Sequence, residues 1–349
     1  IFERLPSFEN ARRTVRQGLA TAEDFRFVRL WWETETSRVG EKWSPFAKGG
    51  AFSPFYSDVY LKVNWRNAGA EICNYFDPHT GKGYSRPQNI QHYHRPGLTW
   101  PRRTTSGLSL RAMPAGCIFA DKGPASFVAD DAAEELLTLL SLTSSQPFGV
   151  LVSLQLAAAD AAARSYEVGV IQKTPVPDLS APQQNQLAEL ARTAWSLKRT
   201  LDITTETSHA FVLPAALCGR LGNHEPSTIE AELERIQAEI DAIAFDLYGF
   251  SDADRDMAQG GVEADEAVDA DDEDVKSDGE APPLDALFSW AIGVSFGRFD
   301  WRLATGERDA PPEPEPFDPL PAKSPGMLPD DAEPFHGHPR ILVDDAGHE

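Results

Sequence analysis

The chain has 349 residues, which gives room for about two domains. Its composition, with 41% apolar, 10% aromatic and 25% charged residues, predicts a folded protein with a sizeable core. Its formal net charge of −22 is uneven: residues 1–130 hold 18 Lys and Arg against 12 Asp and Glu, so overall acidity does not exclude a nucleic-acid partner. No apolar run approaches the ~18 residues of a membrane span, and the first residues do not show the pattern of a secretory signal. Cys73, Cys117 and Cys218 are too far apart for a zinc ribbon or disulfide framework.

The first third of the chain predicts β structure. Residues 1–42 are polar and arginine-rich, and because the first residue is Ile rather than Met we interpret them as a linking segment in a piece of a longer protein. An apolar patch at Phe25 to Trp32 fits either a strand or a short helix. From Trp43 to Val128, the short runs DVYLKVNW, NAGAEI and AGCIFA are separated by Gly, Pro and Asn, which is typical of a β-rich module with functional loops.

Helical signals follow this module. Asp131 is placed to cap a helix through EELLTLLSL, and the SSQPF at residues 144–148 ends that helix before the second apolar segment GVLVSLQLA. The prolines of QKTPVPDLS, at residues 172–180, predict an extended junction, because the residue before a proline is disfavoured in the helical region.

Two long helices are predicted after the junction. The first has an apolar stripe at three- and four-residue steps, formed by Leu187, Leu190, Ala194, Leu197 and Leu201. The second opens with a capping-box pattern at Ser227 and Glu230 and stops at Gly249. Twenty-odd residues make a rod of roughly 30 Å, and we expect the two rods to pack as an antiparallel pair.

The last hundred residues are mostly polar. Residues 261–280 contain ten acids and one lysine, and such a run predicts a solvated linker. Residues 284–303 predict a short buried helix and turn, and the proline-rich APPEPEPFDPLPAKSPG then predicts a segment without regular structure.

Signatures of catalysis and metal binding are missing from the sequence. There is no GxSxG, HExxH, Walker loop or GxGxxG motif. His92 and His94 would share one face of a strand, but they have no third ligand nearby. We therefore assign no catalytic residue and no metal ligand.

The stretch from Arg86 to Arg111, RPQNIQHYHRPGLTWPRRTTSGLSLR, combines the side chains that read base edges in DNA. Lys48 precedes two glycines that would let the backbone approach a phosphate or simply make a turn. The alternative interpretation is that Tyr93, Leu98 and Trp100 anchor a core and the arginines are ordinary surface charge. Composition alone favours that alternative.

The order of several segments resembles a known family. In chain order, these segments are RQGLATAEDFRFVRLWWE, KWSPFAKGG, DVYLKVNWRNAGAEI, RPQNIQHYHRPGLTWPRRT and AMPAGCIFADKGP. Together they look like the C-terminal half of large adenine-specific DNA methyltransferases. The enzymes in question are the PglX-like enzymes of BREX phage-defence systems and type IIG restriction–modification proteins. TSSQPF and QKTPVPDLS resemble the segments that end their target-recognition domains, and FSWAIGVSFGRFDWRLATG resembles a segment after their spacer helices. The resemblance extends from about residue 12 to about residue 330.

The resemblance implies an α+β (mixed α/β) fold with five parts. These are a linking segment from a missing upstream catalytic domain (1–42), a β-rich target-recognition domain (43–180), an antiparallel pair of spacer helices (181–252), an acidic disordered linker (253–283), and a small helical segment with a proline-rich tail (284–349).

The resemblance also implies a function in binding double-stranded DNA and presenting a flipped adenine to the upstream methyltransferase domain in the bacterial cytoplasm. S-adenosylmethionine would serve the parent enzyme and would not be bound by this chain, which lacks the glycine motif for that cofactor and the Asn/Asp/Ser-Pro-Pro-Tyr/Phe loop. The residues expected to contact DNA are Lys48, Arg86, Gln88, Asn89, His92, Arg95, Thr99, Arg102, Arg103, Thr104 and Arg111.

Two alternatives stay open. The parent could also carry a nuclease, as a fused restriction–methylation protein. Alternatively, the chain could be a non-enzymatic module whose basic front and acidic tail assemble other subunits of a defence complex, with no membrane involved.

Overall fold

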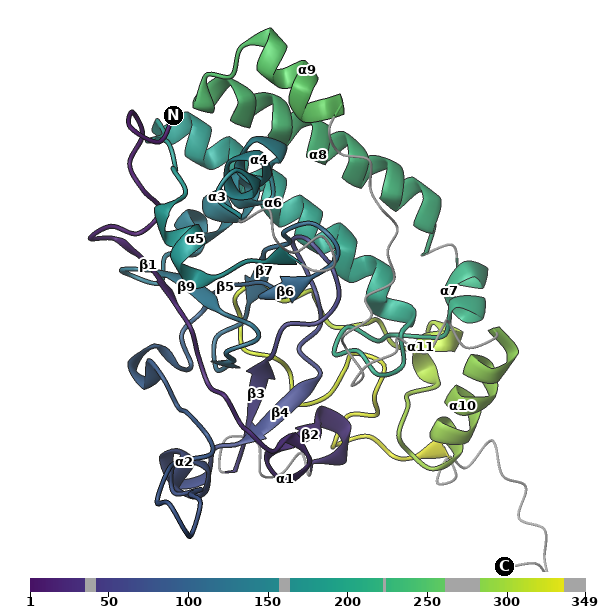
Figure 1. The fold of residues 1–349 in the computed structure, drawn as a ribbon. Coiled ribbons are helices and arrows are strands. Elements are labelled where there is room, and N and C mark those ends of the chain that lie inside the picture. The colour runs from purple at the N-terminus through teal and green to yellow at the C-terminus, as the bar shows by residue number, and fades with distance from the viewer. Residues whose placement is uncertain (35–41, 157–163, 222–223, 261–282, 336–349) are drawn as a thin grey trace, which may run out of the picture.

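The computed structural model describes residues 1–34, 42–156, 164–221, 224–260 and 283–335 (Figure 1). These residues form a mixed α+β fold, as the sequence predicted, with the sheets in the first half of the chain and the long helices after them. The acidic run at residues 261–280 lies outside the described residues.

Two four-stranded sheets organise the β-rich part. The first is antiparallel, in the order β1-β9-β5-β7, with strands Arg13–Arg16, Ala125–Val128, Gly97–Thr99 and Arg111–Met113. The second has the order β2-β4-β3-β8, with strands Val28–Leu30, Leu61–Asn64, Trp43–Ala47 and Ile118–Phe119, of which β3 and β8 are parallel. A two-stranded ladder joins β6 (Arg103–Thr104) to β10 (Arg164–Ser165).

The N-terminal segment contributes to both sheets. Strand β1 pairs with β9, and Val15 within it is fully buried. The apolar patch at residues 25–32 divides between helix α1 (Asp24–Phe27), strand β2 and a short 3-10 helix (Trp31–Glu33). Residues 1–34 therefore fold together with the β-rich module, and a domain boundary at residue 42 stays a prediction.

One expected β run is a helix instead. The NAGAEI segment lies in α2 (Arg66–Cys73), which begins with left-handed backbone at Asn67, Ala68 and Gly69. At Gly69 the indole of Trp65 approaches so closely that a Cβ would lie 2.6 Å from it. Glycine tolerates the left-handed backbone and leaves room for the indole. Local packing therefore favours a helix where the sequence pattern predicted a strand.

The helices follow the predicted order. Their bounds are α3 Ala133–Thr143, α4 Gln146–Ser153, α5 Val168–Lys173, α6 Ala181–Leu201, α7 Ala215–Leu221, α8 Pro226–Tyr248, α9 Asp252–Gly260, α10 Pro283–Ser295 and α11 Arg302–Thr305, with short 3-10 helices at Ile90–His92 and Asp202–Thr204.

The predicted helix pair is confirmed. Helices α6 and α8 pack antiparallel (Figure 1), and α8 ends at Gly249 in a left-handed conformation. The capping box occurs at the start of α6, between Ser180 and Gln183, rather than at the start of α8, where Glu225 is the first flanking residue. Ser145, inside the predicted helix break, caps α4 by accepting from the Phe148 N–H.

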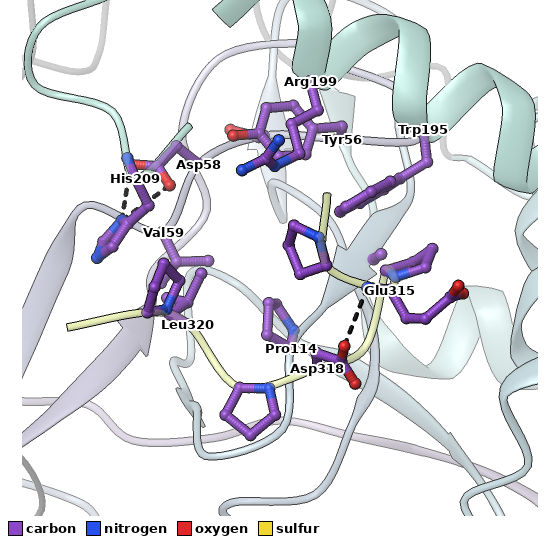
Figure 2. Close-up of a pocket in the computed structure, with 16 residues that line it drawn as sticks. Tyr56, Asp58, Val59, Pro114, Trp195, Arg199, His209, Glu315, Asp318 and Leu320 are labelled. Carbon is purple, nitrogen blue, oxygen red and sulfur yellow. Dashed lines mark hydrogen bonds and ion pairs between the residues drawn. The ribbon is translucent and has the colours of Figure 1, made fainter. Parts of the chain in front are cut away.

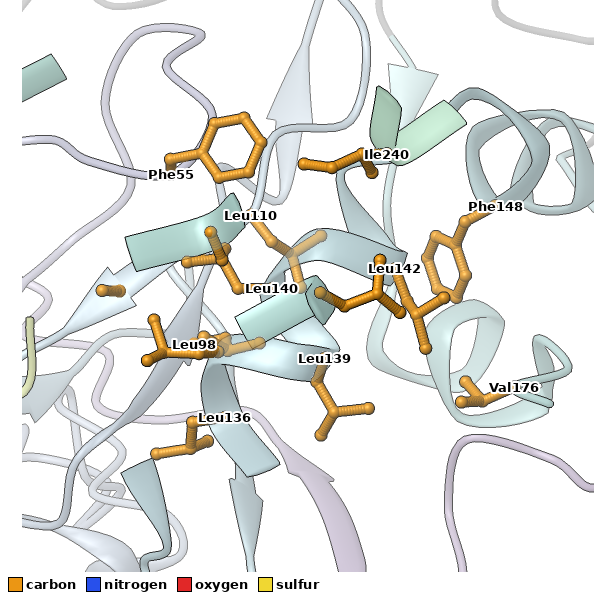
Figure 3. Close-up of a cluster of buried hydrophobic side chains, with 14 of the residues drawn as sticks. Phe55, Leu98, Leu110, Leu136, Leu139, Leu140, Leu142, Phe148, Val176 and Ile240 are labelled. Carbon is orange, nitrogen blue, oxygen red and sulfur yellow. The ribbon is translucent and has the colours of Figure 1, made fainter. Parts of the chain in front are cut away.

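Helix α3 is the centre of the larger core (Figure 3). Its leucines contact the first sheet through Leu98 and the facing helices through residues such as Ile240 and Phe148. The leucines at 136, 137, 139, 140 and 142 are all buried, at 3% exposure or less. Every residue of α3 from Leu136 to its last residue, Thr143, is buried, and this part of the helix is covered by the sheet, α4, α6 and α8.

The proline-rich segment has no regular structure, as predicted, yet it packs on the rest of the fold. The Glu313 carboxylate lies 3.4 Å from the Arg199 guanidinium of α6. The Ala115 N–H donates to the Phe317 carbonyl at 3.0 Å, and the Phe317 ring is buried in the larger core. We call residues 311–321 the strap.

Helix α10 forms where the sequence predicted a short helix, but its expected burial is wrong. Leu284, Phe288, Ile292 and Phe296 are exposed, and Phe296 is 85% exposed. The opposite side of the helix packs through Val294 against Phe299. Within the described part of the chain, no single helix is long and apolar enough to cross a membrane; α3 and α4 pass that test only as a pair bent by 67°.

Candidate nucleic-acid interface

Three loops meet beside the second sheet and carry four cations. They are residues 48–50 after β3, residues 101–103, which lead from β5 into the first residue of β6, and residues 121–123 between β8 and β9. The Arg102 N–H donates to the Lys122 carbonyl at 2.9 Å, which joins two of the loops. We call Lys48, Arg102, Arg103 and Lys122 the basic cluster.

Glycines allow the loops to approach this closely. A Cβ on Gly123 would lie 2.6 Å from the backbone nitrogen of Gly49, and one on Gly49 would lie 2.9 Å from the Lys122 carbonyl oxygen. Both distances are shorter than a side chain tolerates. Glycine at positions 49 and 123 therefore lets the backbones that carry Lys48 and Lys122 touch.

The cations of this cluster differ in exposure. Arg103 and Lys122 are exposed, whereas the partly buried Lys48 ammonium pairs with the Asp24 carboxylate. Arg102 is partly exposed, and its Nε lies 3.9 Å from a Glu167 carboxylate oxygen. Exposed cations on a fixed backbone are suited to phosphate contacts.

Asp24 is held in its charged form. Burial alone would raise the pKa of its carboxyl, but hydrogen bonds from Lys48 and Thr21 and the positive charges of Lys48 and Lys122 lower that pKa below its ordinary value. Asp24 thus fixes the Lys48 side chain at the edge of the basic cluster.

A second group of predicted residues lines the neighbouring backbone. The Gln88 amide donates to the Gly18 carbonyl at 3.4 Å, and the Asn89 amide donates to the Gln17 carbonyl at 2.8 Å. The Arg86 backbone pairs with Ala20, and its side chain is exposed. These contacts attach residues 86–89 to residues 17–20, whose backbone bonds residues 119–121 beside the basic cluster.

His92 and Arg95 form a pair next to this group. His92 ends a 3-10 helix rather than lying on the expected strand, and its ring stacks on Phe127 with centroids 5.1 Å apart. An Arg95 nitrogen is 3.2 Å from His92 Nδ1. Burial lowers the pKa of His92, and the positive charges of Arg95 and Arg16 lower it further.

The two histidines do not form a metal site together. The Nδ1 of His94 lies 3.0 Å from the Gly116 carbonyl, while His92 faces Arg95 and Phe127. Among the described residues, no group of three or more His, Cys, Asp or Glu side chains could hold a metal ion.

Three of the residues predicted to contact DNA are buried. Thr99 donates to the Pro124 carbonyl at 2.9 Å, and the Thr104 hydroxyl accepts from the Ser106 N–H at 3.0 Å. The Arg111 guanidinium donates to the carbonyls of Gly49 and Ala51. Burial lowers the pKa of Arg111 to about 10, which leaves it charged at neutral pH. These three side chains bond the protein's own backbone, and their contact with DNA stays a prediction.

The interpretation of Tyr93, Leu98 and Trp100 as core anchors is confirmed, at 5%, 0% and 0% exposure. Sequence reasoning missed Lys122, although Lys122–Gly123 repeats the Lys–Gly pair of Lys48–Gly49. It also missed Arg164, which is exposed on β10 beside β6.

A cavity lies between the strap, helix α6 and the chain around Tyr56 (Figure 2). Its wall includes Trp195, Arg199 and the His209–Asp58 pair, whose Nδ1 and Oδ1 atoms are 2.9 Å apart. The cavity measures about 30 Å³, enough for one or a few water molecules.

Comparison with known proteins gives two curated relatives, and no protein-family model matches the chain. The adenine-specific methyltransferase PglX of Lacticaseibacillus casei is 26% identical over 314 residues, covering 82% of this chain and 24% of the relative. The adenine-specific methyltransferase BrxX of Escherichia coli is 26% identical over 191 residues, covering 53% of this chain and 14% of the relative. The chain is homologous to these methyltransferases.

The expected resemblance to PglX-like proteins is thereby confirmed, and the chain spans a quarter or less of each relative's length. Among solved structures, the chain resembles the Type IIL restriction–modification enzyme MmeI in complex with DNA, with a TM-score of 0.46 and 12% identity over 74% of this chain and 36% of MmeI.

Proposed function

We propose that this chain recognises the DNA target within an S-adenosylmethionine-dependent, adenine-specific DNA methyltransferase of a BREX or restriction–modification defence system. In this proposal the chain binds duplex DNA and presents a flipped adenine to a catalytic domain that is not part of the chain. The cofactor belongs to that domain, and no residue of this chain is assigned a catalytic role.

The basic cluster carries the proposal. It brings Lys48, Arg102, Arg103 and Lys122 together from three loops, although up to 74 positions separate them in the sequence. Cations that replace the counterions of phosphates supply much of the affinity for DNA. The homology to adenine-specific methyltransferases makes duplex DNA the polyanion that this cluster would meet.

The predicted contacts have different proposed roles. Arg102, Arg103, Lys48 and Lys122 contact the phosphate backbone and fix the register of the duplex. We assign a base edge to Arg86, whose side chain is exposed. One bidentate contact to guanine contributes about 1–3 kcal/mol of discrimination. Four neighbouring side chains support the Arg86 segment. Gln88 and Asn89 bond residues 17–20, His92 stacks on Phe127, and Arg95 bonds Asp131.

Fluorescence anisotropy with a labelled duplex tests the proposal between about 50 and 200 mM salt. We expect Arg102→Ala with Arg103→Ala to weaken binding and to reduce the slope of log affinity against log salt by about 2, because each lost phosphate contact removes about 0.9. Arg220→Ala with Arg235→Ala, on exposed positions of α7 and α8, is the matched control. Unchanged affinity and slope in the first variant would exclude the cluster as the DNA contact.

A second candidate function is assembly with other protein subunits. The exposed apolar residues of α10 favour it, because such side chains commonly mark protein contacts. Under this alternative, the chain would bind no DNA in the anisotropy experiment, and Phe288→Ser would weaken its association with the other subunits of the defence complex.

A further inference from the structure

The loop that begins at Lys48, a residue of the basic cluster, also carries an exposed aromatic side chain, Phe52. Phe52 is 47% exposed. Its ring packs along the loop after β6, where a Cβ on Gly107 would be 3.6 Å away. Lys48 lies four residues before Phe52, and Arg103 lies four residues before Gly107. The two segments that meet at the ring therefore each carry a cation of the basic cluster.

The backbone that carries Phe52 has a fixed shape. Gly49 and Gly50 have φ of 110° and 108°, a region that residues with a Cβ rarely adopt. The Ser53 N–H donates to the Ser109 hydroxyl at 3.3 Å, and the Phe55 N–H donates to the Leu110 carbonyl at 2.9 Å. These contacts hold the loop at its end.

Arg111 holds the middle of the same loop from inside. Its buried guanidinium donates to the Ala51 carbonyl at 2.9 Å and to the Gly49 carbonyl. These bonds satisfy two backbone oxygens on either side of Gly50 and leave the guanidinium pointing away from solvent. A loop that is ordered before binding loses little conformational entropy when it meets a partner.

The surroundings of Phe52 fit a nucleic acid. Single apolar side chains that are presented among cations are used by DNA-binding proteins to pack against bases or to wedge between base steps. A ring at this position, with Lys48 and Arg103 on adjacent segments, can meet a base while the cations meet the flanking phosphates.

We propose that Phe52 packs against a base of the bound duplex at an opened base step, and that Arg111 is the positioning residue that fixes the loop presenting it. This inference rests on the proposed function, because it requires that the basic cluster binds DNA. It gives the buried Arg111 a role in DNA binding without any contact to DNA.

Binding of the 349-residue chain to two labelled duplexes of one sequence, one fully paired and one with a central mismatched step, tests the proposal. An opened step costs less unstacking in the mismatched duplex, so the wild-type chain should prefer it. Phe52→Ala should weaken binding about 5- to 100-fold and abolish the preference, as expected for the loss of one base–aromatic contact. Its salt slope should stay that of the wild type, because no cation is removed.

Two further variants separate packing from other causes. Phe52→Trp should retain both the affinity and the preference, because it keeps a flat aromatic surface. Phe288→Ala, at an exposed position on α10, should change neither. Arg111→Lys keeps a charge but loses the two-carbonyl geometry, so it should reduce the preference, and adding it to Phe52→Ala should cause little further loss.

The outcomes distinguish the two proposals. If the wild type and Phe52→Ala bind both duplexes equally while Arg102→Ala with Arg103→Ala still lowers the salt slope, the role of Phe52 is wrong and the proposed function stands. If the wild type shows no salt-dependent binding, both are wrong. Urea unfolding of every variant identifies any that lose binding only because they fail to fold.

Discussion

The Arg95 guanidinium donates to the Asp131 carboxylate at 2.6 Å, across a separation of 36 positions in the sequence. The same guanidinium donates to the Val128 carbonyl at 2.6 Å and lies over the Phe127 ring. Asp131 therefore does not cap helix α3, whose first flanking residue is Ala132, and Arg95 is engaged by the end of strand β9. The pair ties the segment after the 3-10 helix to the start of α3.

We expect Arg95→Met to lower the free energy of unfolding by about 1–3 kcal/mol, because it removes charge-assisted hydrogen bonds to Asp131 and Val128. Asp131→Asn should cost less, about 0.5–1 kcal/mol, because this carboxylate is partly exposed. Urea unfolding at neutral pH measures both. Equal stability of Arg95→Met and wild type would show that the pair contributes nothing to the fold.

Gly123→Ala should destabilise the protein by about 1–3 kcal/mol, since the new Cβ would lie 2.6 Å from the Gly49 backbone nitrogen. Gly149→Ala is the matched control, because it lies within α4 with no atom within 4 Å of its Cβ position. That substitution should stabilise the protein by about 0.5–1 kcal/mol. Thermal unfolding compares the two, and a neutral Gly123→Ala would contradict the close approach of the loops.

Acid should loosen the Asp24–Lys48 pair. The pKa of Asp24 is lowered in the folded state, so its contribution to stability is present above the ordinary carboxyl pKa of about 3.9 and is lost as the pH falls through the folded value. We expect Asp24→Asn to be less stable than wild type at neutral pH and the difference to shrink below about pH 4. Urea unfolding at a series of pH values gives this difference, and one that is independent of pH would contradict the lowered pKa.

The strap should contribute to global stability through Phe317. Phe317→Ala is expected to cost about 2–4 kcal/mol, because the buried ring leaves a cavity in the larger core. Phe296→Ala, at an 85% exposed position, should change stability by less than about 0.5 kcal/mol. If calorimetry gives the same midpoint for both variants, the strap is not part of the cooperative fold.

Periodic elements were predictable from the sequence. The stripe of α6 and the Gly249 stop of α8 are local signals, and the structure confirms both helices. The pairing of β1 with β9 had no such signal, because each strand has four residues and more than 100 positions separate them. The packing of the strap was likewise hidden, since prolines exclude regular structure without indicating what the segment contacts.

The candidate interface was only partly predictable, because residue type does not reveal exposure. Arg103 and Arg111 both lie on short strands, yet Arg103 is exposed and Arg111 is buried against two carbonyls. Which face a strand residue occupies depends on pairing that a single sequence does not show. Lys122 was missed for the same reason, since only the meeting of Gly49 and Gly123 brings it to Lys48.

A methylation map of genomic DNA tests the central claim most directly. The map would compare hosts that express the complete gene with hosts in which residues 1–180 are exchanged for a relative's. The exchange should begin at residue 1, because β1 belongs to the same sheet as β5, β7 and β9. We predict methyladenine at one asymmetric motif and a different motif after the exchange. The same motif in both hosts would contradict the assignment of this region as the reader of the target site.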